Sequence, residues 1–253
     1  MLKAVLFDLD NTLIFFDEVA FFRKYLDRIS RVFDDIMDFK VFRDRIISST
    51  QAILENDGEA SNADYFMNVF SEGFEDRRDE LWKRFLDFYA TEFDQFKKLA
   101  KRVEGVTDIF RQLQNKNLKL VIASNPFWPE SIQMKRLAWA GLEDVPFDLV
   151  THIENMTSCK PRLEYYREIC QKIDERPESC LMVGNDPVND MIVSKIGMKT
   201  FLTIDCLKNL GSSLLMSNAI RNQSIEDFPE PDFRGSILEV VGVVEQLMAK
   251  PTN

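Results

Sequence analysis

Two aspartates near the start of the chain, Asp8 and Asp10, have the residue type and spacing that could carry out chemistry. They directly follow a short apolar run, Ala4–Phe7, which contains no turn residue and is typical of a buried strand. Neighbouring carboxylates repel each other, and burying either one costs free energy. A divalent cation would offset this cost, leaving one carboxylate to act as a nucleophile and the other as a proton donor. The alternative is a solvated strand–helix junction with Asp10 or Thr12 as a helix cap.

Further polar groups follow later apolar runs of the chain. The pair Ser124–Asn125 offers a hydroxyl, an amide and the N–H groups of a turn, which suit phosphate oxygens, although Ser–Asn–Pro is also a common turn sequence. Lys160 precedes Pro161, an ordinary start for a helix, and could place a compact positive charge at the same edge of a sheet.

A second acidic motif, Gly184–Asp190, ends another apolar run and carries Asp186 and Asp190. Taken alone, these acids could be a helix cap and a first-turn acid that the helix dipole favours. The carboxyl ends of parallel strands share one edge, where open α/β sheets bind their ligands. We therefore expect this motif to lie close to Asp8 and Asp10.

The elements that must position these residues alternate between strands and helices. This alternation predicts an α/β fold, a Rossmann-like parallel sheet in a three-layer αβα arrangement. Strands are predicted at 4–7, 118–123, 147–153, 180–183 and 199–204, and helices at 106–115, 130–141, 162–173, 188–196 and 237–248. A helix over 210–220 is compatible with the pattern, and no structure is assigned to the rest of 206–232.

Residues 17–96 have a different hydrophobic pattern, in which apolar side chains recur at steps of three and four and no strand-like run occurs. The polar stretch 55–62 divides this region and is predicted to be a loop between helical pairs. We expect four helices in a small all-α bundle. Because the first strand belongs to the sheet, the bundle is an insertion: residues 1–15 plus 100–253 form the α/β domain, and 16–99 the helical domain.

Composition restricts the partners of the chain. A formal net charge of −10 over 253 residues argues against nucleic acid, and no stretch approaches the roughly 20 apolar residues of a membrane span. The four cysteines show no metal-ligand spacing, which favours reduced thiols in a cytoplasmic protein. The single histidine, His152, is expected to be structural. Monomer and homodimer both remain open.

In combination, these motifs resemble the haloacid dehalogenase-like hydrolase superfamily over nearly the whole chain. The opening segment Phe7–Leu13 is close to the most specific motif of that superfamily, and Gly197–Thr200 is similar to the segment after its last acidic motif. The helical insertion looks like the four-helix cap of the branch that contains phosphoglycolate phosphatase-like enzymes.

The resemblance implies a role for each matching residue. Asp8 would attack phosphorus and form an aspartyl-phosphate, and Asp10 would protonate the leaving oxygen and later activate water. Lys160 would neutralise Asp8 and the phosphate, because a dianionic phosphate cannot approach an anionic nucleophile unless cations lie beside both. Binding of the phosphoryl group is implied for Ser124, Asn125, Lys160 and, as support of the loop, Thr12.

The resemblance also implies Mg²⁺ as the cofactor. Its ligand set would be Asp8, Asp10 (through its backbone carbonyl as well), Asp186 and Asp190. The chain departs from the family pattern at Asn185, since the family usually has aspartate after this glycine. Either Asn185 occupies the primary ligand position and one metal-binding charge is lost, or the register shifts by one and Asp186 is the ligand. We favour the second register, because it preserves both acids.

The function expected from the resemblance is a Mg²⁺-dependent phosphatase that acts on a small phosphorylated metabolite. Asp10 discriminates against the dehalogenase branch, which lacks an acid at this position. The alternatives are a phosphomutase with the same core chemistry and a non-catalytic binding or regulatory relative, for which Asn185 is the only sequence indication.

Substrate specificity in this branch is expected to come from the cap. Candidate residues are Phe15, Phe16 and the loop 55–62, with Arg23, Lys24 and Arg43 as candidate anion contacts. Substrate access would require the cap to swing on linkers near 14–17 and 97–104.

Overall fold

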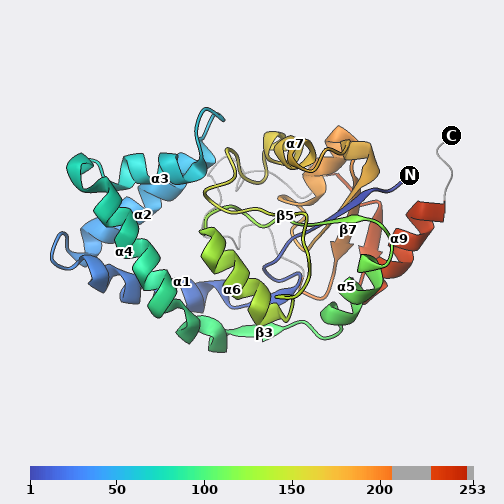
Figure 1. Ribbon diagram of the computed structural model, residues 1–253, viewed down its shortest axis with the longest axis horizontal. Coiled ribbons are helices and arrows are strands. Elements are labelled where there is room, and N and C mark those ends of the chain that lie inside the picture. Colours follow the sequence, from blue (N-terminus) through green and yellow to red (C-terminus); the bar gives the residue numbers. More distant parts are fainter. Residues whose placement is uncertain (207–228, 250–253) are drawn as a thin grey trace.

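A six-stranded, fully parallel sheet forms the centre of the protein, whose computed structural model describes residues 1–206 and 229–249 (Figure 1). The strand order β5-β4-β1-β6-β7-β8 is that of a Rossmann-like sheet. The predicted α/β fold is therefore confirmed. The strands are β1 (Ala4–Phe7), β4 (Lys119–Ile122), β5 (Leu149–Val150), β6 (Cys180–Gly184), β7 (Lys199–Thr203) and β8 (Phe233–Gly235).

Helices cover both faces of this sheet. Alternate side chains of β1 enter opposite layers, with Val5 and Phe7 in one buried cluster and Ala4 and Leu6 in the other. The first face is covered by α5 (Val106–Gln114), α6 (Glu130–Ala140) and α9 (Val240–Ala249), and the second by α7 (Leu163–Lys172) and the 3₁₀ helix η5 (Met191–Ile196).

Four α-helices between β2 and β3 build the helical region, which lies at one end of the molecule (Figure 1). Their starts follow the sequence closely, because Asp17, Asp38 and Ser61 each accept a backbone N–H as N-cap. The helices are α1 (Glu18–Ser30), α2 (Phe39–Leu54), α3 (Asn62–Phe70) and α4 (Arg78–Thr91), joined by the 3₁₀ turns η1 (Arg31–Phe33) and η2 (Glu75–Arg77) and followed by η3 (Phe93–Leu99).

A two-stranded antiparallel ribbon joins the helical region to the sheet. It consists of β2 (Ile14–Phe16) and β3 (Ala100–Arg102), with Phe15 opposite Lys101. The sequence indicated linkers at these two positions but no strands. Pairing them places both connections side by side.

Three elements differ from the sequence prediction. The helix expected over 188–196 is a 3₁₀ helix that begins at Met191, and the strand expected over 147–153 is reduced to Leu149–Val150. Strand β8 was not predicted, since Phe233–Gly235 is too short for a periodic pattern. The helix considered over 210–220 lies outside the described residues. Two further 3₁₀ turns are η4 (Pro177–Ser179) and η7 (Ile237–Glu239).

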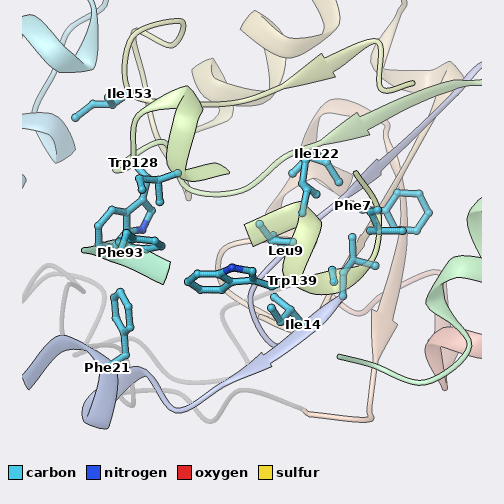
Figure 2. Packing of buried hydrophobic residues seen from close by; sticks show 14 of the residues in the cluster. Phe7, Leu9, Ile14, Phe21, Phe93, Ile122, Trp128, Trp139 and Ile153 are labelled. Carbon is cyan, nitrogen blue, oxygen red and sulfur yellow. The ribbon is translucent and has the colours of Figure 1, made fainter. Parts of the chain in front are cut away.

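One continuous apolar cluster links the sheet to the helical region. Figure 2 shows it running from Phe7 past Trp139 and Trp128 to Phe21. The rings of Trp128 and Phe93 lie 5.6 Å apart, and those of Phe93 and Trp139 are stacked at 5.3 Å. The two parts therefore share a buried aromatic interface.

Cys159, Cys170 and Cys180 are buried thiols. Among the residues described, no helix is both long and apolar enough to span a membrane.

Candidate active site

Asp8 lies at the C-terminal end of the central strand. Strand β1 pairs with β4 on one side and β6 on the other, so Asp8 stands at the point where the strand order reverses. In open α/β sheets, this point is where ligands bind. The backbone N–H of Asp8 donates to the carbonyl of Val183 (2.9 Å), and the side chain is 13% exposed. Its carboxylate is therefore fixed at the sheet edge and still accessible.

Lys160 joins Asp8 to the second acidic motif. Its Nζ lies 2.8 Å from Asp8 Oδ1 and 2.6 Å from Asp190 Oδ1. The side chains of Lys160 and Asp190 are 2% and 0% exposed, so the ion pair is shielded from water. The side-chain oxygen of Asn125 accepts the backbone N–H of Lys160 (3.0 Å), which anchors the lysine to the loop after β4. Four residues that the sequence singled out are thus in one network.

The electrostatics of this network keep Lys160 charged. Burial alone would lower its pKa, but the carboxylates of Asp190 and Asp8 outweigh burial and hold the pKa well above the ordinary value. Burial, with the charges of Asp8 and Asp186, raises the pKa of Asp190 to about 7 against the opposing effect of Lys160. The site therefore holds a fixed cation beside Asp8 that can compensate the charge of an approaching anion.

The side chain that faces the Asp8 loop from the second acidic motif is Asn185. Thr12 Oγ1 lies 3.2 Å from Asp8 Oδ2 and 3.3 Å from Asn185 Oδ1, so its hydroxyl can donate to either oxygen. The carboxylate of Asp186 instead accepts two backbone N–H groups of the following turn (2.9 and 3.1 Å). Asn185 therefore lies on the Asp8 side of this motif, and Asp186 as the metal ligand stays a prediction.

Asp10 forms an ion pair that the sequence analysis missed. The guanidinium of Arg136, on α6, contacts Asp10 Oδ1, and its Nη1 donates to Gln133 Oε1 (2.6 Å). The Arg136 side chain is 3% exposed. The only sequence signal for Arg136 is its spacing of four residues from the buried Ile132 and Ala140. An arginine thus occupies a position on the apolar face of the helix. A buried arginine with one carboxylate partner serves to position that carboxylate.

The loop after β4 is held from behind by buried hydroxyls. The backbone carbonyl of Ser124 accepts from Thr151 Oγ1 (2.7 Å) and from the hydroxyl of Tyr165 (2.7 Å). Burial raises the pKa of Tyr165, so this donor keeps its proton. Ser124 is buried in the same region as Lys160, next to Asn125. Tyr165 was not identified from the sequence, because a buried tyrosine in an amphipathic helix carries no separate pattern.

The oxygen donors around Thr12 suit a magnesium ion. Among residues 1–206 and 229–249, no three or more acidic, histidine or cysteine side chains are grouped to hold a metal. The Asp8 carboxylate and the Asn185 amide oxygen, however, both lie within 3.3 Å of the Thr12 hydroxyl. Mg²⁺ commonly uses one or two carboxylates and completes its shell with water and substrate phosphate. The pair therefore suits this ion.

The helical region contacts the active-site side through its predicted loop. The backbone N–H of Asn62 donates to Met156 O (2.8 Å), and its side chain donates to Ser158 O (3.0 Å). The guanidinium of Arg162 contacts the carbonyl of Asn56. The loop 55–62 thus lies against the segment that leads into Lys160.

The residues that the sequence suggested as substrate contacts of the cap lie in different surroundings. Arg43 lines a cavity that also includes residues after β4, whereas Arg23 and Lys24 are exposed on α1. Phe15 is half-buried in β2.

Comparisons with known proteins place these observations in a family. A family model described as haloacid dehalogenase-like hydrolase matches residues 2–194. The pyrophosphatase PpaX from Oceanobacillus iheyensis is 25% identical over 189 residues, which cover 73% of this chain and 75% of that protein.

Solved structures share the fold at low sequence identity. An L-2-haloacid dehalogenase from Xanthobacter autotrophicus has a TM-score of 0.56 at 20% identity, covering 97% of this chain and 99% of that one. A predicted phosphoglycolate phosphatase from Haemophilus somnus has a TM-score of 0.53 at 14% identity, covering 96% and 98%. At these identities, the similarity shows the fold.

Proposed function

The chain belongs to the haloacid dehalogenase-like hydrolases, and on this premise we propose that it is a Mg²⁺-dependent phosphatase of small phosphomonoesters. The observation that carries the proposal is the buried Lys160, whose Nζ bridges Asp8 (2.8 Å) and Asp190 (2.6 Å) at the sheet edge. In this arrangement the Asp8 carboxylate can act as a nucleophile and has a fixed cation next to it. A dianionic phosphate needs such a cation to approach a carboxylate.

The residues of the site would share the reaction as follows. An Asp8 oxygen forms a bond to phosphorus as the bond from phosphorus to the leaving oxygen breaks. Asp10 donates the proton that the leaving alkoxide needs, and then removes one from the water that releases Asp8. Lys160 stays charged throughout. The loop with Ser124 and Asn125 holds the phosphoryl oxygens, with Thr12 supporting the Asp8 side.

A bound Mg²⁺ would supply charge neutralisation for the phosphoryl oxygens. Asp8 and the amide oxygen of Asn185 would hold it, together with the backbone carbonyl of Asp10 that the family resemblance implies. Asp190 would act through Lys160, since both oxygens of its carboxylate are already bonded, one to Lys160 Nζ (2.6 Å) and the other to the backbone N–H of Asp186 (3.0 Å).

The presence of Asp10 favours phosphoryl transfer over dehalogenation. A dehalogenase needs no proton donor two residues after its nucleophile, because a halide leaves without a proton. Here Asp10 is present, and buried Arg136 positions its carboxylate. We therefore assign the phosphatase rather than the dehalogenase reaction to this chain.

The test is hydrolysis of p-nitrophenyl phosphate by wild-type protein, with Mg²⁺ and with EDTA, and by Asp8→Asn. Asp144→Asn, which changes an exposed acid, is the matched control. We expect turnover that needs the metal, is retained in Asp144→Asn and falls by at least about 10³-fold in Asp8→Asn, as for the loss of a nucleophile. Turnover that survives in Asp8→Asn would overturn the proposal.

A further inference from the structure

A cavity of about 270 Å³ lies between the helical region and the loop that follows the candidate phosphate-binding residues. Its walls come from α1, α2, α3 and α4 on one side and from residues 127–129 and Ile153 on the other. Seven aromatic side chains line it: Phe22, Tyr25, Phe66, Trp82, Tyr89, Phe127 and Trp128. Figure 2 shows Trp128 and Ile153 at this junction. The cavity is large enough for an organic group bigger than benzene, which fills a cavity of roughly 150 Å³.

The hydroxyl groups and the guanidinium group of this cavity have protein partners. The hydroxyls of Tyr25 and Tyr89 bond each other (2.7 Å), and Thr50 Oγ1 donates to the carbonyl of Ile46 (2.8 Å). The single charged residue of the lining, Arg43, holds the carboxylate of Asp44 (2.7 and 3.0 Å). A ligand in the cavity therefore meets apolar walls, which bind apolar groups and penalise hydroxyl-rich or charged ones.

The cavity and the phosphate side of the active site share one short segment of chain. Phe127 and Trp128 follow Ser124 and Asn125, and the N–H of Phe127 bonds the carbonyl of Asn125 (2.9 Å) in a tight turn. Three residues of chain span at most about 11 Å, so Phe127 lies within that distance of Ser124. The side chain of Asn125 in turn contacts the backbone of Lys160 (3.0 Å). The cavity wall at Phe127 therefore lies within about 11 Å of Ser124, a distance that one molecule of modest length can span.

We propose that this cavity holds the leaving group of the substrate, and that the substrate is a phosphate monoester of an apolar alcohol, either aliphatic or aryl-alkyl. The inference rests on the proposed phosphatase function and specifies its substrate class. It separates this chain from the similar pyrophosphatase, because a charged phosphate leaving group would lose its hydration among aromatic walls, and Arg43, the single charged residue there, already contacts Asp44. Sugar phosphates are disfavoured for the same reason.

The experiment is kcat/KM for a homologous series of n-alkyl phosphates, from ethyl to octyl, in which the leaving-group chemistry stays constant. Each methylene that enters the cavity should raise kcat/KM by about fourfold, corresponding to about 0.8 kcal/mol, until the cavity is filled. Glucose 6-phosphate, also an ester of a primary alcohol, and pyrophosphate should be poorer substrates than hexyl phosphate by at least tenfold. A flat or falling series, or a preference for either polar compound, would overturn the proposal while leaving the phosphatase function standing.

Variants on α2 and α1 test whether the cavity itself causes the preference. Ile46→Trp places a large side chain in the lining, and we expect it to lower the octyl-to-ethyl ratio of kcat/KM by at least tenfold. Val41→Trp makes the same change at a 42% exposed position of α2 outside the lining and should leave the ratio unchanged. Leu26→Ala enlarges the cavity and should move the plateau to longer chains. An equal ratio in all four proteins would contradict the assignment.

A binding measurement separates failure of this inference from failure of the proposed function. Octylphosphonate, which cannot be hydrolysed, is titrated into wild-type and Ile46→Trp protein by calorimetry. Binding to wild type that weakens at least tenfold in the variant supports the cavity even if no ester is turned over. Absence of binding, or equal binding to both proteins, would overturn it.

Discussion

At the scale of single residues, Lys160 determines the charge balance of the site. Two carboxylates lie within 2.8 Å of its Nζ, and the lysine side chain is only 2% exposed. The sequence could suggest this lysine through its place before Pro161 and through the family resemblance. Its partners Asp8 and Asp190 lie 152 and 30 residues away in the sequence. The local pattern could therefore not predict the burial of the lysine or its two ion pairs.

We predict that Lys160→Met destabilises the protein by about 3–5 kcal/mol, because it leaves the carboxylates of Asp8 and Asp190 without their buried partner. Phosphatase turnover should be lost as well. Lys83→Met removes an exposed lysine of a surface pair (71% exposed) and should change stability by less than about 1 kcal/mol. Urea denaturation of the three proteins measures the difference. Equal stability of wild type and Lys160→Met would show that the buried ion pairs are not formed.

Asn185 is the residue at which sequence and geometry disagree. Preserving both acids favoured Asp186 as the metal ligand, but the structure engages Asp186 with backbone N–H groups of the next turn. Such local capping competes with any more distant role of an aspartate, and a pattern of spacing does not reveal it.

We predict that Asn185→Asp raises the affinity for Mg²⁺ by about tenfold, because it adds a carboxylate to the donors near Thr12. Asp186→Asn should change it little, since an amide oxygen can still accept the same N–H groups. The measurement is the Mg²⁺ concentration for half-maximal activity in each protein. A tenfold loss of affinity in Asp186→Asn, with no change in Asn185→Asp, would restore the other register.

At the scale of elements, hydrophobic periodicity predicted the helices and the buried strands and missed the strands of three residues. Helices α5, α6, α7 and α9 and the buried strands β1, β4, β6 and β7 lie within a few residues of where the sequence placed them. Strands β2 and β3 have three residues each and are stabilised by pairing with each other across more than 80 residues, so neither carries a pattern of its own. Strand β8 is equally short.

The end of strand β6 packs so closely that only glycine fits. A Cβ on Gly184 would lie 2.1 Å from Asp190 Oδ2 and 2.8 Å from Asp190 Cβ. We predict that Gly184→Ala displaces the Asp190 carboxylate from Lys160 and lowers kcat by at least about 100-fold, with a stability loss of about 1–3 kcal/mol. Steady-state kinetics with thermal unfolding measures both effects.

Gly242→Ala is the matched control for that substitution. A Cβ there meets no atom within 4 Å, and the position is in the interior of α9. The change should keep activity and stabilise the protein by about 0.5–1 kcal/mol through helix propensity. Normal activity in Gly184→Ala would show that the contact with Asp190 is not required.

At the scale of the whole molecule, the sheet and the helical region share one apolar cluster. The sequence predicted both parts, because the sheet region alternates between strand and helix patterns and the helical region has apolar residues at steps of three and four. It did not predict their interface with its cavity, nor the contact of Arg136 with Asp10 inside the α/β part, since these combine residues far apart in the chain.

Four buried tyrosines make the stability of the whole protein sensitive to alkaline pH. Burial raises the pKa of Tyr25, Tyr89, Tyr165 and Tyr166 in the folded state. In the unfolded state these tyrosines ionise near pH 10, whereas in the folded state they do not. Their contribution to the free energy of unfolding is therefore fully present below about pH 10 and is lost as pH rises further. We predict that the free energy of unfolding falls above about pH 10, with a slope of up to about 1.4 kcal/mol per pH unit for each tyrosine.

Urea denaturation at a series of alkaline pH values measures this slope. Tyr166→Phe, which removes one ionisable hydroxyl, should make the decline shallower, although it also removes the hydrogen bond from that hydroxyl to the carbonyl of Asn189. Tyr65 is the fifth tyrosine and is not buried, so its ionisation alone is expected before unfolding. Tyrosinate absorbance equivalent to more than one tyrosine below the unfolding transition would contradict the buried, neutral state of the other four.

The central claim is that Asp8 becomes phosphorylated during turnover. The most direct measurement is acid quenching during steady-state hydrolysis of an alkyl phosphate, followed by mass spectrometry of the peptide that contains Asp8. We predict a mass gain of one phosphoryl group on Asp8, absent from Asp8→Asn and from protein quenched without substrate. To favour accumulation, Asp10→Asn, which slows the release step, is quenched in parallel with p-nitrophenyl phosphate, whose leaving group needs no proton to depart. Sustained turnover with the phosphoryl group on another residue, or in Asp8→Asn, would contradict the account.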